Sequence, residues 1–123
     1  MKPTDSELEI LKVIWSEGPS TVRTVNEKIN EKREVGYTTT LKIMQIMFEK
    51  NMLERTREGK THIYSSCISE EDTLDEMSRR LLNNVFGGSA KRLVMSVLGN
   101  GKSSSAELKE IREYLEKLDK NSK

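Results

Sequence analysis

A mostly α-helical fold that carries one small β-hairpin is the class that this sequence predicts. Hydrophobic residues recur at intervals of three and four along most of the 123-residue chain, which is the spacing of one face of a helix. One short stretch, residues 53–65, is instead rich in strand-favouring residues on both sides of a glycine. The length suits one domain of ordinary size or two small ones.

The first helix is expected to begin at a capping box, in which a hydroxyl and a carboxylate three residues later each bind the other's backbone amide. Thr4 and Glu7 have this spacing, and a Gly-Pro pair at 18–19 ends the helix. A second helix then begins at Ser20 or Thr21. The apolar residues that recur along these two helices are Leu8, Leu11, Ile14 and Trp15, then Val22, Val25 and Ile29.

Three consecutive threonines open the third helix, which we expect to run from Thr38 to Asn51. The side chains expected to face the first two helices are Thr40, Ile43, Met44 and Met47. The residues that form one outward stripe are Thr38, Lys42, Gln45 and Glu49. Periodicity alone does not place Leu41, Ile46 and Phe48.

A β-hairpin is the simplest interpretation of the segment after this helix. Thr56, Ile63 and Tyr64 favour strands, and Gly59 permits the turn between them. Three short helices followed by a hairpin describe a winged helix-turn-helix, which we assign to residues 1–69.

The remaining residues, 70–123, are predicted to form a helical dimerisation domain. Cap spacing recurs at Ser69 with Asp72 and at Ser104 with Glu107, and three amphipathic stripes follow one another. A unit this small rarely supplies an adequate core alone, and pairing with a second copy would bury the stripes. The predicted dimerisation residues are Leu74, Met77, Leu81, Val85, Leu93, Val97, Leu108, Ile111 and Leu115.

The order of these elements favours DNA binding by the third helix and the hairpin. A recognition helix enters the major groove with its first residues nearest the bases, and its N-terminus offers N–H groups and a positive dipole end to phosphate. Lys42 suits a phosphate or a guanine, and Gln45 can pair with adenine. Arg55, Arg57 and Lys60 on the hairpin are expected to reach the adjacent backbone or the minor groove.

Each of these features also has an interpretation without DNA. The threonine run is explained equally by an N-cap with two β-branched neighbours, and Lys42 with Gln45 by an ordinary solvated face. Charges on the hairpin commonly protect an exposed strand edge. The competing function is a winged-helix module that binds protein and does not read DNA. Ile46 is the feature that favours it, since a protein-docking helix exposes apolar residues.

Composition and charge exclude other classes of function. A net charge of +1, from 21 basic and 20 acidic residues, argues against a nonspecific polyanion binder, although local charge can still meet phosphates. The N-terminus does not resemble a secretory signal, and no apolar run reaches the about 20 residues that cross a bilayer, so no membrane insertion is expected. The lone Cys67 cannot form an internal disulfide, which favours a reducing cytoplasm. His62 and Cys67 lack a third metal ligand and a catalytic base, so no metal, cofactor or catalytic residue is expected.

Four motifs occur in an order that is similar to a known family: "ELEILKVIW", "YTTTLKIMQIMFEKNML", "TREGKTHIYS" and "FGGSAKRLVMSVL". On these motifs the chain resembles, from Thr4 to Leu118, the penicillinase (β-lactamase) repressors of the BlaI/MecI group and their copper-responsive relatives. The resemblance implies a homodimeric winged-helix repressor that binds a palindromic operator, often built on TACA/TGTA cores, and blocks a resistance operon. It also implies that the DNA contacts fall on Tyr37, Thr38, Thr39 and Lys42, and on Arg57 and Lys60 of the wing.

The sequence departs from the family pattern at several places. Position 46 is often arginine in relatives and is Ile46 here, and the chain ends "EKLDKNSK" without the cysteines of the copper-responsive branch, so copper sensing is not expected. The resemblance further implies release from DNA when a membrane sensor-protease cuts between an asparagine and a phenylalanine of the dimerisation region. The aligned positions here are Ser96 and Val97, and neither residue matches. An ordinary core helix is the alternative for this segment.

Overall fold

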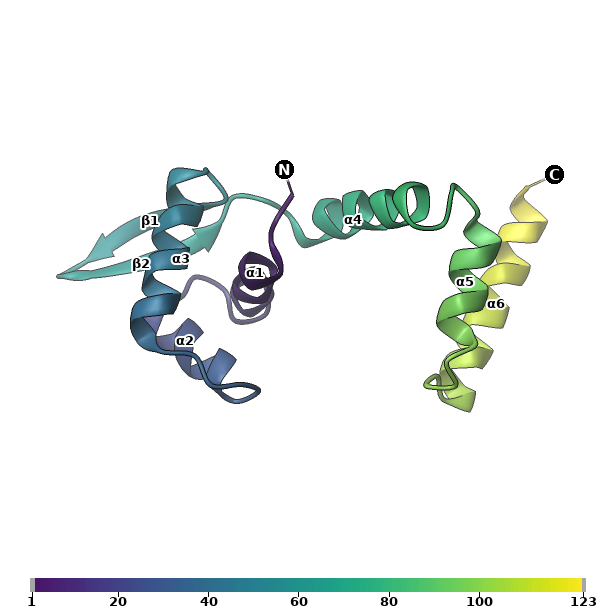
Figure 1. Ribbon diagram of the computed structural model, residues 1–123, viewed down its shortest axis with the longest axis horizontal. Coiled ribbons are helices and arrows are strands. Elements are labelled where there is room, and N and C mark those ends of the chain that lie inside the picture. Colours follow the sequence, from purple (N-terminus) through teal and green to yellow (C-terminus); the bar gives the residue numbers. More distant parts are fainter. Residues whose placement is uncertain (1, 123) are drawn as a thin grey trace. The chain divides into compact units, whose positions relative to one another are not determined.

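The computed structural model describes residues 2–122, which form six helices and one two-stranded antiparallel hairpin (Figure 1). The elements are α1 (Asp5–Glu17), α2 (Val22–Asn30), α3 (Tyr37–Glu49), β1 (Leu53–Glu58), β2 (Thr61–Ser66), α4 (Glu70–Asn84), α5 (Ala90–Leu98) and α6 (Ser105–Asn121). The mostly α class with a hairpin wing is therefore confirmed. The chain divides into two compact units between Ser78 and Arg79, within α4, and each unit is described by itself.

Most of the helices begin at a serine or threonine whose hydroxyl caps the helix, as the sequence predicts. The Thr4 hydroxyl accepts from the Glu7 amide at 3.2 Å, and the Glu7 carboxylate accepts from the Thr4 amide at 2.9 Å, which completes the capping box of α1. Thr21, and not Ser20, caps α2. Ser69 caps α4 and Ser104 caps α6. These local hydrogen bonds satisfy backbone amides that have no partner inside their helix.

One hydrophobic core joins the first three helices to the hairpin. Its buried side chains are Ile10, Leu11, Ile14, Val22, Val25, Ile29, Met44, Met47, Met52, Leu53 and Tyr64. The apolar face of α1 is shifted from the predicted one, because Ile10 lies at its centre while Leu8 and Trp15 are half-buried at its edges. On α3, Met44 and Met47 face the core as predicted, and Ile43 packs against its margin.

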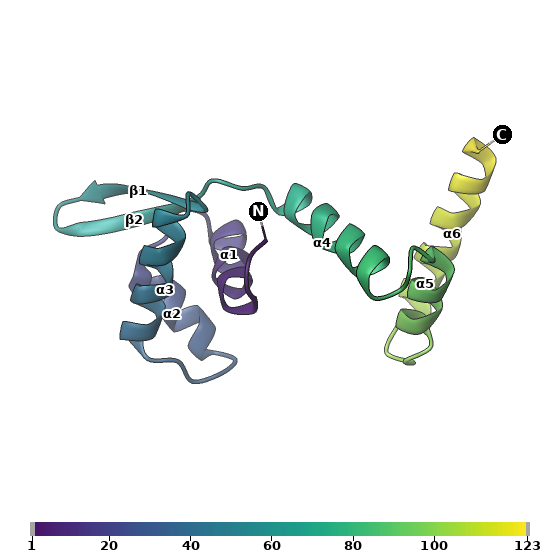
Figure 2. The same cartoon turned by 45° about the horizontal axis from the view of Figure 1, so that its top comes forward.

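The hairpin extends away from the three helices and is attached to them near its base (Figures 1 and 2). Gly59 occupies the turn with φ 65°, a left-handed conformation that side chains other than glycine rarely adopt. Backbone amides and carbonyls of Ser20 and Tyr64 exchange hydrogen bonds of 2.9 and 2.8 Å. The indole of Trp15 also donates to the Ser66 hydroxyl at 3.2 Å. The wing therefore has a fixed position on the first unit.

The second unit has a different character, since no side chain among residues 79–122 is buried. Six of the predicted dimerisation residues are exposed, namely Leu74 in the first half of α4, which belongs to the first unit, and Leu81, Val85, Val97, Leu108 and Leu115 of the second. The other three, Met77, Leu93 and Ile111, are half-buried. The helices that carry these stripes have formed, but within one chain the stripes contact few neighbours. None of the helices in the described part of the chain is long and apolar enough to span a membrane.

Candidate nucleic-acid interface

The start of α3 differs from the starts of the other helices in residues 2–122. Each of those begins with a serine or threonine hydroxyl that accepts a backbone N–H, whereas α3 begins at Gly36 with no side-chain cap. The first turn of α3 also contains no acidic residue. Its first N–H groups and the positive end of its dipole are therefore open to an anion.

The threonines at this end of α3 have different environments. Thr38 and Thr39 are exposed, while Thr40 is only 1% exposed and faces the inside of the unit. None of them caps the helix, so the interpretation of the run as an N-cap is wrong. Two small hydroxyl side chains thus stand on the outside of the first turn, beside the uncapped N–H groups.

The exposed side of α3 continues with polar residues. Lys42 and Gln45 are exposed, as the outward stripe predicts. Tyr37, at the first position of the helix, is 50% exposed, and Ile46 is 38% exposed. These residues form a surface of hydroxyl, ammonium and amide groups with two apolar contacts, which are the groups that read base edges and thymine methyls in a major groove.

The basic residues of the hairpin do not have equivalent positions. Arg57 and Lys60 are exposed near the turn. The guanidinium of Arg55 instead lies 3.9 Å from the centre of the Phe48 ring and donates to the Tyr64 hydroxyl at 3.4 Å. Arg55 is therefore held on the scaffold by a cation–π contact, and the outer part of the wing carries the exposed positive charge.

A hollow between the starts of α2 and α3 and the wing adds one basic residue, Arg23, that the sequence pattern did not single out. Arg23 of α2 lines it together with Lys60 and His62 of the wing and with Tyr37 of α3. No acidic residue is among the side chains that line it. The available signal was the position of Arg23 in the first turn of α2, two residues after its cap Thr21 and close to the positive dipole end where phosphates bind.

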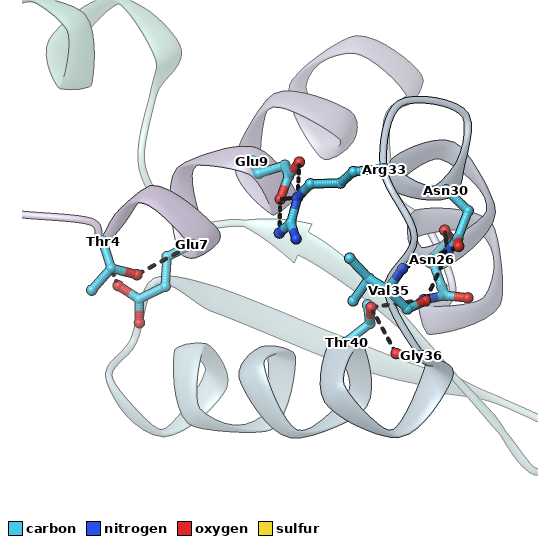
Figure 3. Close-up of polar contacts among 9 residues, drawn as sticks. All are labelled: Thr4, Glu7, Glu9, Asn26, Asn30, Arg33, Val35, Gly36 and Thr40. Atoms are coloured by element: carbon cyan, nitrogen blue, oxygen red, sulfur yellow. Dashed lines mark hydrogen bonds and ion pairs between the residues drawn. The ribbon is translucent and has the colours of Figure 1, made fainter.

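Two ion pairs neutralise other charges of the first unit, Arg33 with Glu9 and Lys50 with Glu7. Figure 3 shows the first of them. Arg33 binds Glu9 with 2.6 Å between Nη2 and Oε1, and this hydrogen bond lowers the pKa of Glu9 despite partial burial. Burial raises the pKa of Glu7, but hydrogen bonds from Lys50 and Thr4 together with the Lys50 charge outweigh it, so the pKa is lowered. These cations serve the scaffold and leave the outward surface of α3 and the wing to carry the interface.

The chain offers little for metal or nucleophilic chemistry. In residues 2–122, no three His, Cys, Asp or Glu side chains gather where they could hold a metal ion. Desolvation and the nearby Glu54 carboxylate raise the pKa of the Cys67 thiol, which disfavours the reactive thiolate.

Comparison with known sequences gives one family over nearly the whole chain. A family model described as penicillinase repressor matches residues 3–117. The penicillinase repressor of Staphylococcus aureus is 24% identical over 115 residues, covering 94% of this chain and 91% of that protein. The penicillinase repressor of Bacillus licheniformis is 28% identical over 113 residues, covering 92% of this chain and 88% of that protein.

Solved structures agree with this result. The solution structure of monomeric Bacillus licheniformis BlaI in complex with the blaP half-operator is 25% identical, with a TM-score of 0.51 over 58% of this chain and 88% of that one. The DNA-binding domain of the repressor BlaI is 26% identical with the same TM-score of 0.51, covering 58% and 93%. A MarR family protein from Bacillus stearothermophilus has a TM-score of 0.56 over 97% and 74%, at 18% identity, and shares the fold.

Proposed function

This chain belongs to the penicillinase repressor family, and we propose that it binds a palindromic operator as a homodimer and represses transcription there. Its relatives are named as penicillinase repressors, and repressors are not enzymes. The observation that carries the proposal is the uncapped start of α3, flanked by exposed hydroxyl, ammonium and amide side chains. A helix of this kind can place its first turn against base edges and phosphates together.

Base reading falls on the outward side of α3. Thr38 and Thr39 are small enough to approach the bases, Lys42 suits guanine or a phosphate, and Gln45 suits adenine. The side chain of Ile46 adds an apolar contact that fits a thymine methyl group. Relatives with arginine at this position would read a different base there.

Phosphate contacts fall on the wing and on the hollow beside it. Arg57 and Lys60 are exposed on the hairpin, and Arg23 and His62 line the hollow with Lys60 and Tyr37. Such contacts fix the protein on the duplex and supply affinity that does not depend on sequence. They also explain how a chain of net charge +1 can bind DNA, since Arg23 and Lys60 line one hollow without an acidic residue and local charge is what meets phosphates.

Dimerisation is assigned to residues 70–123, which contain α4, α5 and α6. Its support is that residues 79–122 bury no side chain while Leu81, Val85, Val97 and Leu115 are exposed. A second copy of the same stripes would cover them in a two-fold arrangement. Two recognition helices related in this way require half-sites about 10 bp apart, centre to centre.

The operon controlled by the repressor is proposed to encode a β-lactamase or a related resistance or stress function. The support is the naming of the relatives as penicillinase repressors and as methicillin resistance regulatory proteins.

Selection of bound sequences from a random DNA pool tests DNA reading and palindromy together. We expect an inverted repeat to be enriched, with its two halves one helical turn apart. A pool that stays random after selection would reject the repressor function and favour a protein-docking module. That alternative has less support in the structure, because the large hydrophobic residues that α3 exposes are limited to Tyr37 and Ile46. The rest of its exposed side is polar.

Release by proteolysis in the dimerisation unit is the final part of the proposal, with a membrane sensor-protease as the partner. Ser96 and Val97 are exposed near the end of the short helix α5. Gly99 and Gly101 follow, and glycine makes a helix end easier to unwind into the extended form that proteases bind. A cut there would separate the stripe of α6 from that of α4. Mass spectrometry of the protein from induced cells should find a new N-terminus within residues 95–101, and intact protein leaving the operator would reject cleavage.

A further inference from the structure

Two asparagines of α2 hold the residue that precedes the N-cap of α3 (Figure 3). The Nδ2 atoms of Asn26 and Asn30 donate to the Val35 carbonyl at 3.0 and 2.8 Å. The Val35 amide donates in return to Oδ1 of Asn30 at 3.2 Å. Both backbone polar groups of Val35 are therefore bound by side chains of α2. This fixes where the chain enters α3.

Asn26 makes a second contact, one turn further into the helix. Its Nδ2 donates to Oγ1 of Thr40 at 2.8 Å, and the Thr40 hydroxyl is 3.5 Å from the Gly36 carbonyl, to which it donates. A carbonyl can only accept, so Val35 determines which way the Asn26 amide is turned. One amide group thus connects the entry of α3 with an inward-facing residue of its first turn.

These hydrogen bonds constrain α3 in a way that its apolar contacts do not. The buried side chains of its body are Met44 and Met47, and methionine is unbranched and adapts to small shifts of its neighbours. Hydrogen bonds depend on direction as well as distance. Because Thr38 and Lys42 are four residues apart on one exposed side of α3, a rotation of the helix about its axis turns both side chains together relative to the bases.

We propose that Asn26 is the positioning residue for operator recognition, acting through Thr40 and Val35 to set the rotation and the starting point of α3. The proposal rests on the proposed function of α3 as the reading helix. Sequence discrimination depends on this alignment, whereas binding to random DNA through phosphates does not. Loss of the contact should therefore reduce the preference for the operator more than it reduces affinity for DNA in general.

The test compares four variants of the full chain with the wild type. Asn26→Ala removes the hydrogen bonds to the Val35 carbonyl and to the Thr40 hydroxyl. Thr40→Val keeps the shape of the side chain but removes its hydroxyl, and Thr40→Ser keeps the hydroxyl. Trp15→Phe is the control for stability, because it removes the indole hydrogen bonds to Ser66 and Ile68 at 3.2 and 3.1 Å and leaves the network intact.

The measured quantity is the ratio of the dissociation constants for random DNA and for the selected operator, at one salt concentration and below the melting temperature of every variant. We expect Asn26→Ala and Thr40→Val to lower this ratio about tenfold, the discrimination supplied by one base contact. Thr40→Ser and Trp15→Phe should keep it within about twofold of wild type. Amide hydrogen exchange at Thr40, whose N–H donates to the Gly36 carbonyl at 3.2 Å, should accelerate in Thr40→Val and not in Thr40→Ser.

Several results would overturn the positioning role. An unchanged ratio in Thr40→Val would do so, and this variant decides the matter if Asn26→Ala does not fold. Equal losses on operator and random DNA, or the same loss in Trp15→Phe, would reduce the network to general support of the fold. A wild-type protein without a preferred sequence would overturn the proposed function as well, whereas wild-type discrimination that survives in Thr40→Val overturns the positioning role alone.

Discussion

Replacement of Lys50 by methionine should destabilise the first unit and change how its stability depends on pH. Lys50 is the C-cap of α3, and its Nζ lies 2.7 Å from Oε2 of Glu7 in α1. The side chain of Glu7 is only 5% exposed, while that of Lys50 is 46% exposed. Methionine keeps most of the apolar stem and removes the charge, so the substitution leaves a buried carboxylate without its cation.

The expected loss follows from these exposures. A hydrogen bond to a charged group is worth about 1.5–3 kcal/mol, and more is lost when the remaining partner is buried. The Lys50 ammonium is close to solvent, which reduces the value of an ion pair. The free energy of unfolding should therefore fall by about 1–2 kcal/mol at pH 7. For a unit of this size, that is a decrease of the melting temperature by about 4–16 °C.

The pH dependence provides a second signature. The pKa of Glu7 is lowered in the folded protein from its ordinary value of 4.5, so the ionised carboxylate stabilises the fold above that value. This contribution is lost as the pH falls through the lowered pKa. In Lys50→Met the burial that raises the pKa of Glu7 and the hydrogen bonds with Thr4 that lower it remain, while the hydrogen bond and the charge of Lys50 are gone. The variant should therefore begin to lose stability at a higher pH, and the difference from wild type should shrink in acid.

Fluorescence of Trp15 is the appropriate assay. It is the only tryptophan of the chain and lies in α1, so it reports unfolding of the first unit separately from the second. Lys42→Met is the matched control, since it removes an exposed lysine from the same helix. Urea titrations between pH 3 and 8 would be compared. If Lys50→Met and Lys42→Met have equal midpoints across this range, the ion pair does not stabilise the fold and the reasoning is refuted.

The interface, the dimer and the thiol allow three further predictions. Lys42→Ala should weaken operator binding by about 1–3 kcal/mol. Arg57→Ala should instead weaken binding to all DNA sequences alike and reduce the slope of log affinity against log salt concentration by about one. Gel-shift titrations at several salt concentrations would measure both effects. Equal behaviour of the two would contradict their roles. Leu115→Asp should yield monomers in sedimentation experiments, and an unchanged dimer would reject α6 as part of the interface. Cys67 should react slowly with disulfide reagents at pH 7 and faster at higher pH, because burial and the Glu54 carboxylate raise the pKa of its thiol. Glu54→Gln should accelerate this reaction, because it removes the carboxylate.

Most of the fold could be predicted because its signals are local. The capping box of Thr4 and Glu7 and the Gly-Pro pair at 18–19 act within a few residues, and the structure contains the α1 boundaries that they predict. Periodicity also placed Met44 and Met47 in the core. The burial of Glu7 was not predictable in the same way, because its ion partner is 43 residues away in the sequence.

The candidate site was predicted less completely, for a similar physical reason. Arg55 and Arg57 are two residues apart on one strand and share a face, so pattern alone treats them alike. They differ because Phe48 of the neighbouring helix lies under Arg55. The network of Asn26 and Val35 depends on how the loop before α3 folds back onto α2. Contacts of this kind appear only when separate elements meet.

The absence of buried side chains in residues 79–122 has a consequence for the abundance of the protein. If association with a second copy supplies the folding free energy of this unit, its stability must increase with protein concentration. A dilute repressor would then unfold locally and be degraded faster than a concentrated one. A fall in repressor level would in this way reinforce itself, so that derepression, once begun, proceeds more steeply than the loss of intact chains alone would produce.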